Sequence, residues 1–277
     1  MTPLRVLIVG HGKVGHGLQR ASRSAGSSLT CRLRSLSAVR PTDLGWASLV
    51  LLAVPDGAIR SSAEVLATLS DAPPPVLHLS GSRPVDEASA CREHGALHPL
   101  ASFAARGATP QLEGVHFALG GTPAARRVGR RFATAVGGQV LRTTRSTATP
   151  LHGPAYHAAA ALVANGSAAL AASGVDILTR LGVTPLSSRR AVAGLLRTVA
   201  YNVEHVGVPN ALTGPVMRGD ADTVAKHRVA LASLGGGSHS VYDAVALAIL
   251  SCAEDAGLAA EAAAKVRRAL TKRVRPT

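Results

Sequence analysis

Aromatic residues and lysines are scarce in this chain of 277 residues. The sequence holds three Phe, three Tyr and one Trp, and only four of its 30 basic residues are lysines. So few aromatic rings leave little surface on which unpaired bases could stack. The arginines give a net charge of +14, but they are spread through both halves of the chain. We interpret this basicity as an arginine-rich composition with a preference for small anionic ligands, and we predict no nucleic-acid partner.

Cysteines are also few, and no long apolar run opens the chain. The three cysteines lie far apart, at positions 31, 91 and 252, which excludes a disulfide framework and predicts no metal site. The apolar run at residues 6–9 is too short for a signal peptide. Residues 146–175 carry no formal charge, but this stretch is rich in Ala and contains Pro, His and Asn. Such a helix fits a protein interior better than lipid, so we expect a soluble cytoplasmic protein without a membrane partner.

The pattern of apolar runs divides the chain into an α/β half and an all-α half. In the first half, apolar strands alternate with helical stretches, which is typical of a Rossmann-type parallel sheet with helices on both faces. Its strands are predicted over residues 4–9, 28–34, 48–54, 76–79 and 115–119, and its first helix over 13–25. Helices are predicted in the second half over residues 155–181, 186–206, 221–234, 240–256 and 259–273. We predict two domains, 1–147 and 148–277.

A glycine-rich turn follows the first predicted strand. Gly10, Gly12 and Gly15 form a GxGxxG pattern that opens the first helix, and His11, Lys13 and Val14 fill the positions between them. In dinucleotide-binding sheets the first glycine makes the turn, the second lets the backbone approach a pyrophosphate, and the third lets helix and strand pack closely. The amino terminus of the helix adds free N–H donors and a positive dipole end. The turn predicts a dinucleotide site.

The end of the second predicted strand indicates which dinucleotide binds. NAD-binding proteins usually place an acid there, but this chain has Arg34 and Ser35 and no acid between Gly15 and Asp43. A guanidinium at this point can grip the 2′-phosphate of NADP(H), a contact worth roughly 1.5–3 kcal/mol. Arg32 is expected on the face of the strand opposite to Arg34. The alternative is an arginine that is merely solvated. We predict NADP(H) as the cofactor.

Two further loops are expected over the cofactor at the carboxyl ends of parallel strands. The first holds Val54, Pro55 and Asp56, and the second holds Ser80 and Gly81. Gly81 allows close backbone approach. Asp56 and Ser80 could instead act as helix caps.

These motifs together resemble a family of Rossmann-like oxidoreductases that carry a C-terminal helical domain of unknown function. The resemblance rests on LAVPD at 52–56, HLSGS at 78–82, HPL at 98–100, GPAYH at 153–157 and, most specifically, ALTGPVMRGD at 211–220. The wider relatives are pyrroline-5-carboxylate reductases, deazaflavin-dependent NADP oxidoreductases, and β-hydroxyacid dehydrogenases with ketopantoate reductases. The resemblance implies that the helix after Gly153 faces the nicotinamide and that subunits form a homodimer through the helical domain. The β-hydroxyacid enzymes use a catalytic Lys on that helix, but this chain has no Lys between Lys13 and Lys226.

Two polar side chains on that helix are candidates for the chemistry. His157 lies near its start, and an ordinary imidazole pKa of about 6.5 suits a proton donor at neutral pH. Asn165 lies eight residues further on, close enough in angle to share a broad face and hold a substrate oxygen. Either could be a satisfied polar group in a helical core. Their joint presence on an Ala-, Leu- and Val-rich helix favours a catalytic role.

Two more candidates lie elsewhere in the chain. His98 precedes Pro99, which disfavours helix and predicts a loop at the ligand edge of the sheet, although a structural hydrogen bond to backbone is equally compatible. Arg218 could bind a substrate carboxylate or pair with Asp220, which is placed to cap the helix starting at residue 221. Four arginines at positions 126, 127, 130 and 131 are interpreted as the solvated face of a helix.

The sequence therefore predicts an NADPH-dependent oxidoreductase that transfers a hydride to a small anionic carbonyl or imine compound. A 2-keto acid of the ketopantoate type is the candidate substrate. The alternative is a non-catalytic NADP(H)-binding protein, either a redox sensor or a partner subunit, because a fold does not settle a function.

Overall fold

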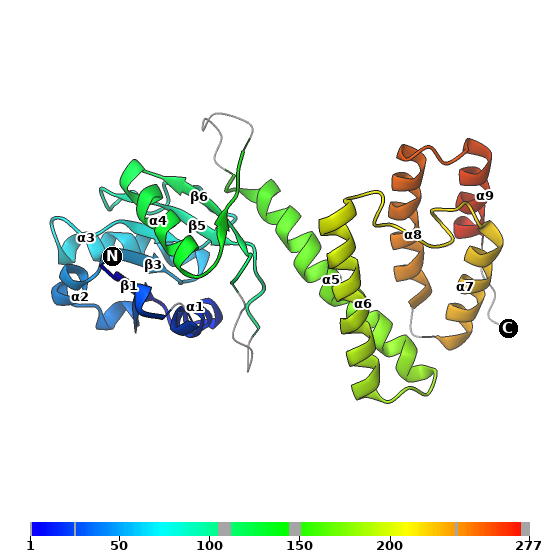
Figure 1. Ribbon diagram of the computed structural model, residues 1–277, viewed down its shortest axis with the longest axis horizontal. Helices are drawn as coiled ribbons and strands as arrows, with labels where there is room; N and C mark the ends of the chain where they lie inside the picture. Colours follow the sequence, from blue (N-terminus) through cyan, green and yellow to red (C-terminus); the bar gives the residue numbers. More distant parts are fainter. Residues whose placement is uncertain (1, 25, 105–111, 144–150, 236–237, 273–277) are drawn as a thin grey trace. The chain divides into compact units, whose positions relative to one another are not determined.

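The computed structural model describes residues 2–24, 26–104, 112–143, 151–235 and 238–272 (Figure 1). The chain divides into two compact units, Met1–Ala164 and Asn165–Thr277, and the division falls inside the long helix α5 (Pro154–Arg180). The predicted domain boundary between residues 147 and 148 lies outside the described residues.

The first unit is built on a seven-stranded sheet in the order β2-β1-β3-β4-β5-β6-β7. Strands β1 to β5 run parallel to one another, β6 is antiparallel to β5, and β7 is parallel to β6. Strand β1 pairs with β2 on one side and β3 on the other, so the strand order reverses there, which is where such sheets bind ligands. The strands are β1 (Leu4–Val9), β2 (Leu29–Arg34), β3 (Leu49–Leu52), β4 (Val76–His78), β5 (His94–Pro99), β6 (His116–Gly121) and β7 (Gln139–Val140).

Helices cover both faces of this sheet (Figure 1). On one face, alternate residues of β1 pack with α1 (Lys13–Ser24) and α4 (Pro123–Ala135), and Phe117 and Phe132 meet edge to face. On the other face, Leu7 and Val9 pack with α2 (Pro41–Trp46) and α3 (Ile59–Leu69). Strands buried on both faces are continuously apolar, which is why their runs could be recognised from sequence. The predicted α/β fold with a helical C-terminal region is confirmed.

Three features of the sheet differ from the sequence-based expectation. β5 and the short β7 were not predicted, and β6 runs antiparallel in a sheet expected to be parallel. β5 contains two histidines and a glycine and therefore lacks an apolar run. His98 was expected on a loop but lies in β5, because the residue before a proline is restricted to extended backbone, which a strand also provides.

The second unit holds a three-helix cluster. α7 (Ala221–Leu234), α8 (Ser238–Asp255) and α9 (Ala260–Thr271) bury a small core that includes Val224, Leu250 and Val266. Asp220 accepts a hydrogen bond from the Thr223 backbone N–H at 3.0 Å, so the predicted cap of α7 is confirmed.

Helix α5 departs from the expectation of a buried core helix. None of its residues is buried, and Leu162 and Val163 are 75% and 69% exposed. Near its C-terminal end it packs against α6 (Pro185–Val206), where Gly174 faces Val192 and Thr179 donates to Ser188. By length and composition alone, α5 is also the one helix among the described residues that could cross a membrane.

Candidate active site

The glycine turn has the geometry that a pyrophosphate requires. Gly10 has a φ of +121°, and a Cβ there would lie 2.2 Å from the Ala53 carbonyl oxygen. A Cβ on Gly15 would lie 2.0 Å from the Gly10 carbonyl oxygen. Gly12, in contrast, has open space on its Cβ side, at the amino terminus of α1. The first and third glycines are therefore required by packing, and the second leaves room for a ligand beside free helical N–H groups.

The other residues predicted on this turn lie around it. His11 and Lys13 are exposed, with the His11 ring centroid 5.6 Å from that of His16, while Val14 packs against the core beneath. That these three residues contact the cofactor stays a prediction.

Arg34 lies beside the glycine turn, because the Gly10 N–H donates to the Arg34 carbonyl oxygen at 2.8 Å. Its Nε is 3.6 Å from Asp43, a buried acid that also accepts a hydrogen bond from Arg32 at 3.3 Å. Arg32 and Arg34 thus share one face of β2, and the expectation of opposite faces is wrong, since side chains two residues apart on a strand point the same way. The Arg34 side chain is 41% exposed, and its Nη1 donates to the Leu33 carbonyl oxygen at 3.3 Å. Both this hydrogen bond and the ion pair are long, so the guanidinium can still turn to an anion.

Ser35, the other residue predicted here, is half-buried and follows β2 directly. Its hydroxyl lies 3.4 Å from that of Ser37.

The two loops after β3 and β4 are joined to each other. The Ser82 hydroxyl donates to Asp56 at 2.5 Å, so Asp56 links the loops and caps no helix. Ser80 accepts hydrogen bonds from the backbone N–H groups of Ser82 and Arg83, which fixes the second turn. Val54 packs on the core below, and Pro55 is exposed. Both loops lie at the carboxyl edge of the parallel strands, as predicted.

Gly81 leaves space for an imidazole. A Cβ on this residue would come within 2.9 Å of the His98 ring. Its carbonyl oxygen accepts the Gly153 N–H at 2.9 Å, which ties the start of α5 to this loop. At Gly81, the absence of a side chain therefore lets His98 and the start of α5 approach the loop backbone closely.

His98 and Tyr156 form a direct pair across this loop. The His98 Nδ1 and the Tyr156 hydroxyl are 2.8 Å apart, and the rings meet edge to face. Burial, reinforced by repulsion from His157, lowers the pKa of His98 to about 4, so the imidazole is neutral at pH 7. Burial raises the pKa of Tyr156 to about 12, so the phenol keeps its proton. One hydrogen bond joins a neutral imidazole to a protonated phenol, and the imidazole tautomer decides which group donates. With the proton on Nδ1, His98 donates to the phenol oxygen and the phenol proton stays free.

Two further histidines lie behind this pair. The His152 ring lies 5.9 Å from the Tyr156 ring and 6.2 Å from the His78 ring, measured between centroids. His152 is 8% exposed, and neither of its ring nitrogens has a partner among the described residues. Burial, with repulsion from His78 and His98, lowers the pKa of His152 to about 4. His78 binds the Pro84 carbonyl oxygen through Nε2 at 2.9 Å.

The four predicted catalytic residues are only partly brought together. His157 is exposed, and its ring centroid lies 6.0 Å from that of His98, so these two belong to one cluster. Asn165 and Arg218 are both exposed and belong to the second unit. The described ion pairs do not include one between Arg218 and Asp220. Hydrogen bonds from Thr223 lower the pKa of Asp220, with a smaller contribution from Arg218.

The sequence-based reasoning missed Tyr156, His152 and His78 as members of the cluster. The GPAYH and HLSGS motifs contain Tyr156 and His78, and His152 directly precedes GPAYH, so the motifs themselves were the available signal. Among the described residues no group of three or more His, Cys, Asp and Glu could hold a metal ion.

A chain of contacts joins the glycine turn to the imidazole cluster. It runs from Gly10 against Ala53, through Asp56 and Ser82, to Gly81 against His98. One edge of the sheet thus carries open space at Gly12 and a group that can exchange a proton.

Comparison with known proteins agrees with this geometry. Residues 115–249 match the model of a domain of unknown function, DUF2520. The match confirms the resemblance indicated by the motifs. None of the curated proteins matches the chain.

Several solved structures share the fold at low sequence identity. A Bacteroides fragilis protein provisionally assigned as an NADP oxidoreductase superposes with a TM-score of 0.67 at 15% identity, over 90% of this chain and 99% of its own. Plasmodium falciparum pyrroline carboxylate reductase, crystallised with NADP bound, gives 0.57 at 10% identity, over 96% and 99%. Coxiella burnetii pyrroline-5-carboxylate reductase gives 0.55 at 14% identity, over 99% and 100%. These similarities establish a Rossmann-like fold.

Proposed function

We propose that the protein is an NADPH-dependent oxidoreductase that reduces a small anionic carbonyl or imine compound, with a 2-keto acid of the ketopantoate type as the candidate substrate. The observation that carries the proposal is the shared sheet edge, where the opening at Gly12 is linked through two loops to the hydrogen-bonded pair of His98 and Tyr156. The NADP oxidoreductase and the pyrroline carboxylate reductases of the same fold support it.

The cofactor site of this proposal uses backbone and one guanidinium. The N–H groups at the start of α1 receive the pyrophosphate, and Gly12 gives it access. Arg34 binds the 2′-phosphate, because its backbone is hydrogen-bonded to the turn and its side chain is half-exposed. When bound, NADPH supplies the hydride.

The chain's own residues supply the proton. Tyr156 donates its hydroxyl proton to the substrate oxygen or nitrogen as the neighbouring carbon accepts the hydride. A phenol is a stronger acid than the alcohol that forms, so this transfer runs downhill even with the pKa of Tyr156 near 12. His98 holds the phenol in place and stays neutral at pH 7. Tyr156 is the donor that the geometry favours over His157, which is exposed.

The cofactor half of the proposal is tested by calorimetry with NADPH and NADH. NADPH is expected to bind more tightly, and Arg34→Ala should weaken NADPH about tenfold or more while leaving NADH unchanged. Arg32→Ala is the matched control. Arg32 also contacts Asp43, but it lies two residues before Arg34, whose backbone is hydrogen-bonded to the glycine turn. Absence of heat with either nucleotide, or tighter binding of NADH, contradicts the assignment.

The catalytic half is tested by NADPH oxidation with a panel of 2-keto acids and cyclic imines. Tyr156→Phe should lower kcat by about 100-fold or more with unchanged NADPH affinity, whereas Tyr201→Phe, on the exposed face of α6, should have no effect. If His157→Ala loses activity and Tyr156→Phe does not, His157 is the proton donor and Tyr156 is not. NADPH binding without oxidation by any of these compounds would favour a non-catalytic sensor or partner subunit.

A further inference from the structure

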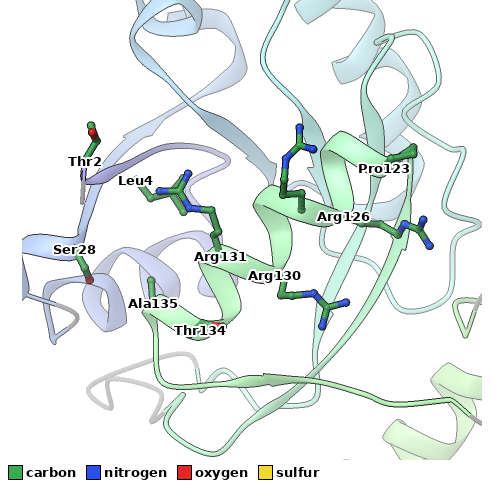
Figure 2. Close-up of a pocket in the computed structure, with 10 residues that line it drawn as sticks. Thr2, Leu4, Ser28, Pro123, Arg126, Arg130, Arg131, Thr134 and Ala135 are labelled. Carbon is green, nitrogen blue, oxygen red and sulfur yellow. The ribbon is translucent and has the colours of Figure 1, made fainter.

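The arginines of α4 line a hollow that the proposed reaction does not use. The hollow has a volume of about 780 Å³, and its walls come from the start of β1, the residue before β2 and one side of α4 (Figure 2). Four of its ten lining residues are arginines, at positions 126, 127, 130 and 131. From the sequence, these four arginines were interpreted only as the solvated face of a helix. The sequence pattern does not show that the ends of two strands lie opposite this helix.

The fold explains why the arginines gather here. Ala125, Val128, Phe132 and Ala133 are buried against the sheet, so the remaining positions of α4 point outward. Arginines four residues apart lie one above the other on a helix. Figure 2 shows Arg131 extending towards Leu4 at the start of β1, while the end of the Arg130 side chain points away from Leu4. The hollow thus has guanidinium groups on the α4 side and Thr2, Leu4 and Ser28 on the other.

Among the residues that the structure describes, no carboxylate pairs with these arginines. The lining residues include no Asp or Glu, and in the described part of the chain none of the four arginines makes an ion pair. Like charges at a spacing of four residues repel each other. Each guanidinium offers a planar fork of donors that matches the oxygens of a phosphate.

The hollow lies at the opposite end of β1 from the glycine turn. Leu4 lines it and Gly10 follows the other end of the strand, a separation of about 20 Å at roughly 3.3 Å per residue. The hollow is therefore separate from the dinucleotide site. Its volume falls in the range of small-molecule pockets, roughly 300–1,000 Å³.

We propose that this hollow, the α4 arginine site, binds a small polyanion with at least two phosphate groups. Arg127 and Arg131 are about 6 Å apart along the helix axis, which suits two linked anionic groups. A small ligand fits better than nucleic acid, because no aromatic residue lines the site to stack on a base.

Calorimetry of the full chain with tripolyphosphate tests the proposal, with saturating NADPH present to fill the glycine turn. We expect Arg127→Ala/Arg131→Ala to weaken tripolyphosphate about tenfold or more. Arg189→Ala/Arg190→Ala is the matched control, a neighbouring pair of exposed arginines on α6 that lines no hollow, and it should change affinity less than about twofold. If the chain does not bind NADPH, the proposed cofactor is wrong. The difference in tripolyphosphate affinity between the two double variants still tests the α4 arginine site, so the two proposals can be rejected independently.

Further probes identify the ligand class. Orthophosphate should bind at least about tenfold more weakly than tripolyphosphate, since one group cannot reach both arginines. ATP binding equally well would indicate that the phosphate chain alone is recognised, and tighter ATP binding would indicate a nucleotide. The proposal is overturned if the Arg127 and Arg131 variant binds like the wild type, if both double variants lose affinity equally, if orthophosphate matches tripolyphosphate, or if a 20-base-pair duplex binds more tightly through these arginines.

Discussion

Gly10, Gly12 and Gly15 occupy one turn, but a methyl group at each would meet different surroundings. At Gly15 it would collide with the backbone carbonyl of Gly10, and at Gly12 it would meet no protein atom within 4 Å. The same motif therefore contains a glycine that the fold requires and a glycine that only a ligand would require.

Two single substitutions separate these roles. Gly15→Ala should lower the free energy of unfolding by about 1–3 kcal/mol or more, because backbone atoms must move. Gly12→Ala should leave it within about 0.5 kcal/mol of wild type and yet weaken NADPH about tenfold or more, since the methyl group occupies the space of the approaching pyrophosphate. Denaturant unfolding and calorimetry measure the two effects. Wild-type NADPH affinity in Gly12→Ala would show that no pyrophosphate lies at this turn.

The same contrast explains which site residues the sequence could predict. The glycine turn is local, and its strand-turn-helix context is readable from neighbouring residues. The pair of His98 and Tyr156 joins residues 58 positions apart, and it depends on the register of β5 and on where α5 begins. Residue types and spacing carry no information on such a contact, so His98 could be placed at the ligand edge while its partner could not be named.

At the scale of the elements, predictability follows from how each strand or helix is buried. β1 and α7 were predicted with the bounds that the structure gives, because β1 is an unbroken apolar run and α7 is marked by Asp220 and Gly235. β5 pairs with β4 and β6 through a sequence with histidines and a glycine, and it owes its strand structure to its neighbours. The reversal of β6 is likewise a property of the assembled sheet.

The three-helix cluster of the second unit depends on a side chain that no pattern indicated. Arg228 on α7 is 6% exposed and makes two hydrogen bonds, of 2.7 and 2.9 Å, to Asp243 on α8. Its remaining donors reach the carbonyl oxygens of Ala269 and Lys272 at the end of α9, at 2.5 and 2.7 Å. One guanidinium thus joins all three helices and satisfies the free C-terminal carbonyls of one.

Removing this guanidinium should destabilise the cluster strongly. Arg228→Ala leaves Asp243 and two carbonyl oxygens without their partner, and we expect a loss of about 3–5 kcal/mol in the free energy of unfolding. Arg180→Ala, which breaks the exposed pair with Asp176, serves as the comparison and should cost about 0.5 kcal/mol or less. Denaturant melts of both variants check the difference, and equal stability of the two would refute the structural role of Arg228.

On the scale of the whole molecule, helices α5 and α6 carry several exposed apolar side chains. We propose that a second copy covers α5 and α6, where Leu162, Leu195 and Tyr201 are 75%, 65% and 61% exposed. Exposed apolar surface of this kind marks interaction sites in soluble proteins. Lipid is a poorer partner, because Asp176 and Arg180 carry charge on the same helix. A homodimer through the helical region remains our prediction, as does a cytoplasmic location.

Light scattering of the purified chain tests this arrangement directly. The wild type should show about twice the mass of 28.1 kDa, because burying the α5 side chains against a second copy removes apolar area from water. Leu162→Glu should shift it to a monomer, since a charge would be buried at the interface without a partner. Val65→Glu, on an exposed position of α3 outside this region, should remain dimeric. A wild type that is monomeric at micromolar concentration, or a dimer that survives Leu162→Glu unchanged, would mean that α5 is not the surface through which copies associate.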